Sequence, residues 1–122
     1  MHTLAIVDDD CEILDVFKRF FSAKENIRVM TYSEPQTALE SLAKNPVDLI
    51  LLDIMMPKLD GLDFLKKLKE RHIRSKVIMV TAHSTLDRIL VSHKFDAADF
   101  VTKPVNLNEL YNKIENILSK PS

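Results

Sequence analysis

Acidic side chains stand directly behind two apolar runs of this chain. The run TLAIV ends in three consecutive aspartates, Asp8, Asp9 and Asp10, and the run LILL ends in Asp53. Carboxylates this close repel one another, and each would prefer water to the end of a buried strand. A folded domain that keeps them together therefore needs a positive charge at the same place.

The counter-charge that suits such a group best is Mg²⁺, with Mn²⁺ as an alternative, because Mg²⁺ binds one or two carboxylates and accepts a phosphate oxygen. Lys103 follows a later apolar run and brings a second positive charge, and Thr81 ends another run with a hydroxyl group. A carboxylate beside a metal ion and an ammonium group suits phosphoryl transfer, in which positioning and charge neutralisation do most of the catalysis. We therefore predict a phosphoryl-transfer site that contains Asp8, Asp9 and Asp53.

Each of these residues also has an ordinary explanation when it is taken singly. An acidic residue behind a strand is often the N-cap of the next helix, and this is the function we expect for Asp10. A single threonine or lysine at the end of a strand is usually just solvated. The joint pattern favours the site, because the carboxyl ends of parallel strands meet at one edge of a sheet.

Five apolar runs rich in aliphatic and β-branched residues predict the strands that position these side chains. The runs are TLAIVD, IRVMTY, VDLILLD, KVIMVT and ADFV, at residues 3–8, 27–32, 47–53, 76–81 and 98–101. Three of them are almost continuously hydrophobic, which is typical of parallel strands covered on both faces. Helical patterns between them imply right-handed crossovers and an open parallel α/β sheet with helices on both faces.

The first predicted helix, which follows the three aspartates, has many apolar residues. Its main stripe consists of Ile13, Val16, Phe17, Phe20 and Phe21. Leu14 lies off this stripe and close to the acidic residues. Leu14 either fills the edge of the core, or forms with Ile13 and Pro104 an apolar rim where a phosphodonor docks.

The positions of the other predicted helices follow mainly from the residues at which they begin. Ser33 is expected to cap the second helix, with Pro35 in its first turn. The third follows Asp60-Gly61, the fourth covers residues 84–94, and the last begins after Asn106.

Composition limits the class of protein. A length of 122 residues suits one domain over residues 1–122, and 46% hydrophobic with 29% charged residues is typical of a soluble globular chain. A formal net charge of -1 gives little support to direct nucleic-acid binding, and no apolar run approaches the ~20 residues of a membrane span. Gly61 is the only glycine, whereas dinucleotide fingerprints and P-loops need several. The single cysteine, Cys11, indicates a reducing cytoplasm.

The motifs AIVDDD, LLDIMMPKLDG, VTA and ADFVTKP resemble, in this order and spacing, the receiver domain of two-component response regulators. The resemblance covers the whole chain. It implies a flavodoxin-like (βα)5 sandwich whose five-stranded sheet has the order 2-1-3-4-5. It also implies that a histidine kinase or a His-phosphotransfer protein donates a phosphoryl group to an aspartate, with Mg²⁺ as the cofactor.

The resemblance assigns a role to each residue that matches a motif. Asp53 corresponds to the phosphoacceptor, and Asp8 and Asp9 correspond to the acidic pair that holds the metal ion together with Asp53. The backbone carbonyl of Met55 is implied as a further metal ligand. Lys103 corresponds to the lysine that contacts a phosphoryl oxygen.

Further assignments concern the switch. The Lys103-Pro104 bond is expected to be cis, a form that is costly except before proline. Thr81 corresponds to the switch hydroxyl and Phe100 to the switch aromatic, which we expect to be mostly buried because it lacks a tyrosine hydroxyl. The surface of helix four, strand five and helix five would then contact an effector domain or protein, with a phosphorylation-dependent dimer as one outcome.

Three functions remain open at this point. The first is a signalling phosphoacceptor that catalyses only its own phosphorylation and dephosphorylation and binds neither nucleic acid nor membrane directly. The second is a Mg²⁺-dependent phosphatase with an aspartyl nucleophile, although enzymes of the haloacid-dehalogenase type carry a second acid where this chain has Met55. The third is a receiver-shaped binding module that is never phosphorylated. Whether the chain acts alone or within a longer protein is also left open.

Overall fold

Five strands form a single parallel sheet in the computed structural model, which describes residues 2–53, 61–81 and 97–119. The strands are β1 (His2–Val7), β2 (Ile27–Tyr32), β3 (Leu49–Asp53), β4 (Lys76–Thr81) and β5 (Asp99–Thr102). Their order is β2-β1-β3-β4-β5, and every neighbouring pair is parallel. The predicted fold class and strand order are confirmed, with strand ends that differ from the predicted ones by at most two residues.

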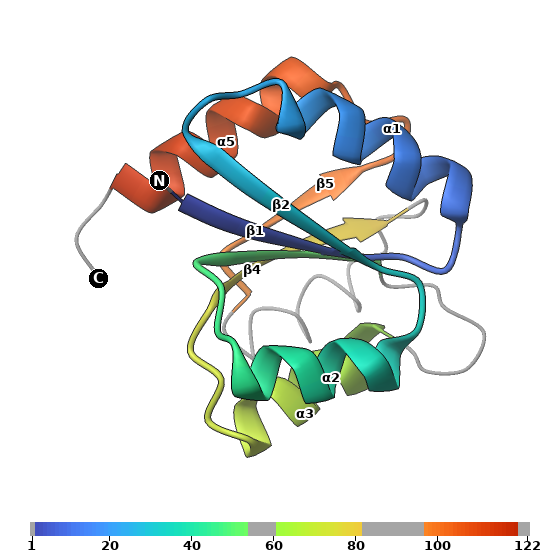
Figure 1. The fold of residues 1–122 in the computed structure, drawn as a ribbon, viewed down its shortest axis with the longest axis vertical. Coiled ribbons are helices and arrows are strands. Elements are labelled where there is room, and N and C mark those ends of the chain that lie inside the picture. The colour runs from blue at the N-terminus through green and yellow to red at the C-terminus, as the bar shows by residue number, and fades with distance from the viewer. Residues whose placement is uncertain (1, 54–60, 82–96, 120–122) are drawn as a thin grey trace.

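Helices cover both faces of this sheet. The described helices are α1 (Cys11–Ser22), α2 (Pro35–Lys44), α3 (Gly61–Glu70) and α5 (Leu107–Ser119). Helices α1 and α5 lie on one face and α2 and α3 on the other, which gives three layers (Figure 1). The helix predicted at residues 84–94 lies outside the described residues.

No helix in the described part of the chain has the length and apolar character needed to cross a membrane.

Alternation of side chains along the strands divides the core into two halves. Leu49 and Leu51 of β3 pack under α1 and α5, whereas Ile50 and Leu52 pack under α2 and α3. Both halves are apolar, so the strands read as continuous hydrophobic runs rather than as an alternating pattern.

The register of β1 and β3 brings the two acidic motifs together. Ile6 pairs with Leu51, and Val7 pairs with Leu52. The residue after Val7 is Asp8 and the residue after Leu52 is Asp53, so the two aspartates lie side by side. Because side chains alternate between faces, both aspartates continue the row that points toward α1 and α5. The pairing of two apolar strands thus determines where the carboxylates meet.

The apolar face of α1 differs from the predicted stripe. Leu14, Phe17 and Phe21 are the buried residues of this helix, whereas Val16 is 52% exposed. Leu14 therefore belongs to the core, which confirms the first of its two predicted places, whereas the prediction that it lies off the buried stripe is wrong. The error arose because two overlapping apolar faces fit the helical period, and only the direction of the sheet decides which one is buried.

Two predicted helix starts can be compared with the structure. Asp10 is the N-cap of α1, where its side chain accepts hydrogen bonds from the amides of Glu12 and Ile13 at 2.9 and 3.4 Å. Ser33 does not cap α2, because the N-cap there is Glu34, whose side chain makes no capping hydrogen bond. Pro35 stands in the first turn of α2, as predicted.

Replacing the α1 cap should cost stability. Asp10→Ala leaves the first amides of the helix without their side-chain acceptor, so the free energy of unfolding should fall by about 1 kcal/mol. Asp15→Ala is the matched control, because it removes the same charge from an exposed position inside the same helix, and the ion pair with Arg19 that it breaks contributes only about 0.3–0.5 kcal/mol. Urea denaturation measures both, and equal losses for the two variants would contradict the capping role.

Candidate metal and phosphoryl-transfer site

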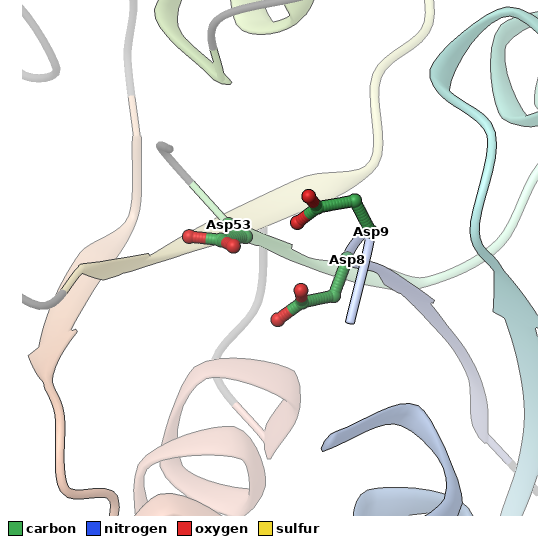
Figure 2. Close-up of side chains that lie close together, drawn as sticks. All are labelled: Asp8, Asp9 and Asp53. Atoms are coloured by element: carbon green, nitrogen blue, oxygen red, sulfur yellow. The ribbon is translucent and has the colours of Figure 1, made fainter. Parts of the chain in front are cut away.

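Three carboxylates converge at the carboxyl end of the sheet. Asp53 is the last residue of β3, and Asp8 and Asp9 follow β1 directly. One oxygen from each side chain lies within 4.8 Å of the other two. Figure 2 shows that all three carboxylates extend to the same side of the strand ends. Asp8 and Asp53 are only 3% and 4% exposed, whereas Asp9 is exposed. The residues that the sequence predicted as metal ligands on β1 and β3 therefore lie together.

Lys103 contacts both buried carboxylates. Its Nζ atom lies 3.8 Å from an oxygen of Asp8 and 3.6 Å from an oxygen of Asp53. Lys103 directly follows β5, and the peptide bond between it and Pro104 is cis. The side chain of Lys103 is 26% exposed, so it is less deeply buried than the two acids. Its ammonium group supplies positive charge to both of them.

A backbone hydrogen bond orients Asp8. The amide of Asp10 donates to Oδ1 of Asp8 at 2.9 Å, so the residue that caps α1 also holds the neighbouring carboxylate. This contact could not be predicted from the sequence, because it depends on the turn between β1 and α1.

The pKa of Asp8 is raised from 3.8 to about 7, and burial is the largest cause. The nearby charge of Asp53 and a side-chain hydrogen bond to it also raise this pKa, whereas the Asp10 amide and the charge of Lys103 lower it. Burial wins, because a carboxylate loses more by leaving water than one amide and one ammonium at 3.8 Å return. The site therefore carries more negative charge than its protein neighbours compensate.

These residues fit a divalent cation. The three side chains offer only oxygen atoms, which are the ligands that Mg²⁺ and Mn²⁺ prefer. Three oxygens within 4.8 Å can approach one ion together. A cation would also supply the charge that the raised pKa of Asp8 indicates is missing.

The remaining predicted site residues are placed less completely. Thr81 is the last residue of β4, and its neighbour Val80 pairs with Asp53, so its backbone lies at the same edge of the sheet. The side chain of Thr81 and the whole of Met55 lie outside the described residues. Phe100 is half-buried rather than mostly buried, and it packs against the core under α2 and α3.

An apolar groove lies beside Lys103, and the sequence predicted it only in part, as an apolar rim. Side chains of α1 and of the segment after β5 line it, namely Ile13, Val16, Phe17, Lys103, Pro104, Val105 and Leu107, around about 230 Å³. Ile13 and Pro104 were predicted to share an apolar rim, but its third member is Val16 rather than the buried Leu14. The sequence feature that indicates this groove is the number of apolar residues on α1. There are more of them than a single buried face of the helix can hold.

The pH dependence of stability should report on Asp8. Between pH 3.8 and about 7 the folded chain holds a proton that the unfolded chain releases. This contribution to the unfolding free energy is full below the lower value and is lost as the pH rises through the upper one. Asp8→Asn cannot ionise and keeps an oxygen for the Asp10 amide. Without divalent metal at about pH 8, it should be more stable than wild type by roughly 2–4 kcal/mol.

Denaturant titrations in chelator from about pH 4 to about pH 8 measure this difference, which should shrink toward the acid end. Added Mg²⁺ should then stabilise wild type at the alkaline end, and stabilise Asp8→Asn less, because a ligand stabilises only the state that binds it. A difference that stays constant across this range would show that burial of Asp8 does not set its pKa.

Comparisons with known proteins agree with this geometry. The family model for the response regulator receiver domain matches residues 4–115. The transcriptional regulatory protein CpxR of Klebsiella pneumoniae is 40% identical over 98% of this chain and 50% of its own length. The DNA-binding transcriptional regulator NtrC of Escherichia coli K12 is 37% identical over 93% of this chain and 24% of its own length. The chain thus spans between a quarter and a half of these relatives.

Solved structures show the same relationship. A CheY-like receiver domain protein from Methanospirillum hungatei superimposes with a TM-score of 0.90 and 30% identity, over 97% of this chain and 94% of that one. A two-component response regulator from Clostridium difficile superimposes with a TM-score of 0.91 and 25% identity, over 98% of each chain. The acidic site, the strand order and these matches lead to one conclusion: the chain belongs to the response regulator receiver domain family.

Proposed function

We propose that this receiver domain accepts a phosphoryl group on Asp53 from a phosphohistidine of a histidine kinase or a His-phosphotransfer protein. The observation that carries the proposal is the position of Lys103, whose Nζ lies 3.8 and 3.6 Å from the two buried carboxylates. A nucleophilic carboxylate, an adjacent acidic cluster and an ammonium group at one sheet edge are the parts that phosphoryl transfer requires. Membership of the family supports the same assignment.

The transfer follows from these positions. An oxygen of Asp53 attacks phosphorus as the bond to the donor's imidazole nitrogen breaks, and the imidazole keeps that electron pair. The product is an acyl phosphate on Asp53. Lys103 offsets the negative charge of the phosphoryl oxygens. Mg²⁺ or Mn²⁺ held by Asp8, Asp9 and Asp53 would supply further positive charge for these oxygens.

The new charge then changes the balance between two arrangements of the domain. Thr81 at the end of β4 would turn toward the phosphoryl group, and Phe100 on β5 would move inward into the space this leaves. A ligand shifts such an equilibrium only through a difference in affinity for the two states, and here the hydroxyl group of Thr81 provides it. The face formed by β5 and α5 would present the change to an effector domain, an effector protein or a second copy of the chain.

The docking site for the donor is proposed from the apolar groove beside Lys103. Val16 is the one large hydrophobic side chain recorded as exposed among the described residues, and it lies in this groove. Lys103 belongs to both the groove and the acidic site, so a partner seated on the groove would bring its histidine close to Asp53. The partner proposed to bind this groove is therefore the protein that carries the phosphohistidine.

The other two functions are less well supported. Aspartyl phosphatases of the haloacid-dehalogenase type carry a second acid two residues after the nucleophile, where this chain has Met55. A module that is never phosphorylated does not account for two buried carboxylates beside a third acid, because their burial costs stability. The domain is therefore proposed to act chemically only on its own Asp53.

Labelling by a small phosphodonor tests the chemistry. With Mg²⁺ and acetyl phosphate, intact mass should show one labile phosphoryl adduct on wild type and none on Asp53→Asn. Asp9→Ala should lose the Mg²⁺-dependent labelling, because one of the three carboxylates is missing, whereas its neighbour Asp10→Ala should keep it. Continuous hydrolysis of varied phosphate esters would favour a phosphatase, and absence of any adduct on wild type would favour the binding module.

Transfer from a protein donor tests the docking site separately. Val16→Glu places a charge in the groove without touching Asp53, so the rate of transfer from a phosphorylated His-phosphotransfer protein should fall about tenfold or more. Labelling by acetyl phosphate should be unchanged, because that donor needs no groove. Lys18→Glu, on the same helix outside the groove, is the control. Equal rates for Val16→Glu and wild type would place the docking site elsewhere.

A further inference from the structure

Asp99 at the start of β5 bridges two layers of the molecule. Its Oδ1 accepts a hydrogen bond from the backbone amide of Phe100 at 2.8 Å. Its Oδ2 accepts one from Nζ of Lys113 on α5 at 2.9 Å. One carboxylate therefore joins the peptide of Phe100 to the helix that covers the opposite face of the sheet.

The arrangement of β5 explains why this bridge matters. β5 is an edge strand, paired on one side with β4. Phe100 packs on the core under α2 and α3, whereas Val101 packs under α1 and α5. Neighbouring residues of a strand point to opposite faces, so Asp99 lies on the α5 face. A movement of β5 that carries Phe100 deeper into one face draws Asp99 away from Lys113 on the other.

We propose that Asp99 and Lys113 are a positioning pair for Phe100, and that their ion pair favours the arrangement in which Phe100 is half-buried. The idea rests on the proposed function, in which phosphorylation moves Phe100 inward. The pair is made in the present arrangement and weakens when Phe100 moves. By linkage, it therefore opposes phosphorylation of Asp53 without touching the site.

The exposure of the pair limits its strength. The side chains of Lys113 and Asp99 are 42% and 35% exposed, so water screens the pair and its contribution is small. A small contribution is still enough to bias a two-state equilibrium, because a modest free-energy difference changes a population several-fold.

Beryllium trifluoride, a stand-in for the phosphoryl group, tests the coupling in the presence of Mg²⁺. Lys113→Met should raise the affinity for beryllium trifluoride about 2- to 5-fold, because the pair no longer holds the unliganded arrangement. Asp99→Asn should act in the same direction, and the double variant should add nothing to the larger single effect. Lys113→Arg, which can remake the pair, should restore the wild-type affinity.

The matched control is a second surface ion pair of the same kind. Arg19 and Asp15 lie 3.1 Å apart on α1, and their side chains are 81% and 56% exposed. Arg19→Met removes the same charge and should leave the affinity at the wild-type value. A similar rise for Arg19→Met and Lys113→Met would attribute the effect to net charge and overturn the proposal.

A second readout needs no phosphorylation. The amide of Phe100 should exchange with solvent faster in Lys113→Met than in wild type or Lys113→Arg, because Asp99 loses its anchor. An unchanged amide, or an unchanged or lower affinity, would overturn the positioning role. Failure of wild type to bind beryllium trifluoride would instead defeat the proposed function and its coupling to this pair, while the Phe100 amide still decides whether the pair positions Phe100.

Discussion

The cost of keeping two carboxylates out of water shapes the active end of this domain. Asp8 and Asp53 are almost fully buried, and burial is the main reason that the pKa of Asp8 is raised to about 7. The fold lowers this cost with an amide at 2.9 Å and an ammonium group shared between the two acids. The compensation is incomplete, which leaves the site with an affinity for positive charge.

This constraint explains the layout of the neighbouring elements. β1 and β3 must pair in one register, because a slip of one residue would turn one carboxylate to the other face. The segment after β5 must return Lys103 to the same edge, although this lysine lies 50 residues after Asp53 in the chain. Asp10 has two roles at this edge, since its side chain caps α1 and its backbone amide donates a hydrogen bond to Asp8.

β5 differs from the acidic site, because none of its residues is fully buried. As an edge strand with half-buried residues, β5 can move at lower cost than the central strands, whose side chains are enclosed on both faces. Its connection to α5 through Asp99 and Lys113 is exposed and correspondingly weak. A buried acidic site beside a weakly held edge strand is the combination that the proposed phosphorylation switch requires.

Local physical chemistry explains which features could be predicted from the sequence. Apolar runs, helix periodicity and the Asp10 cap depend on neighbouring residues alone, and they predict an open parallel sheet with Asp8, Asp9, Asp53 and Lys103 at one edge. The strand order followed from the resemblance to receiver domains. The choice between Leu14 and Val16, the failure of Ser33 to cap α2 and the contact from the Asp10 amide to Asp8 required the tertiary structure. The same holds for the bridge from Phe100 through Asp99 to Lys113. Each of these depends on how a helix or turn sits against the sheet, and residues distant in the chain decide that.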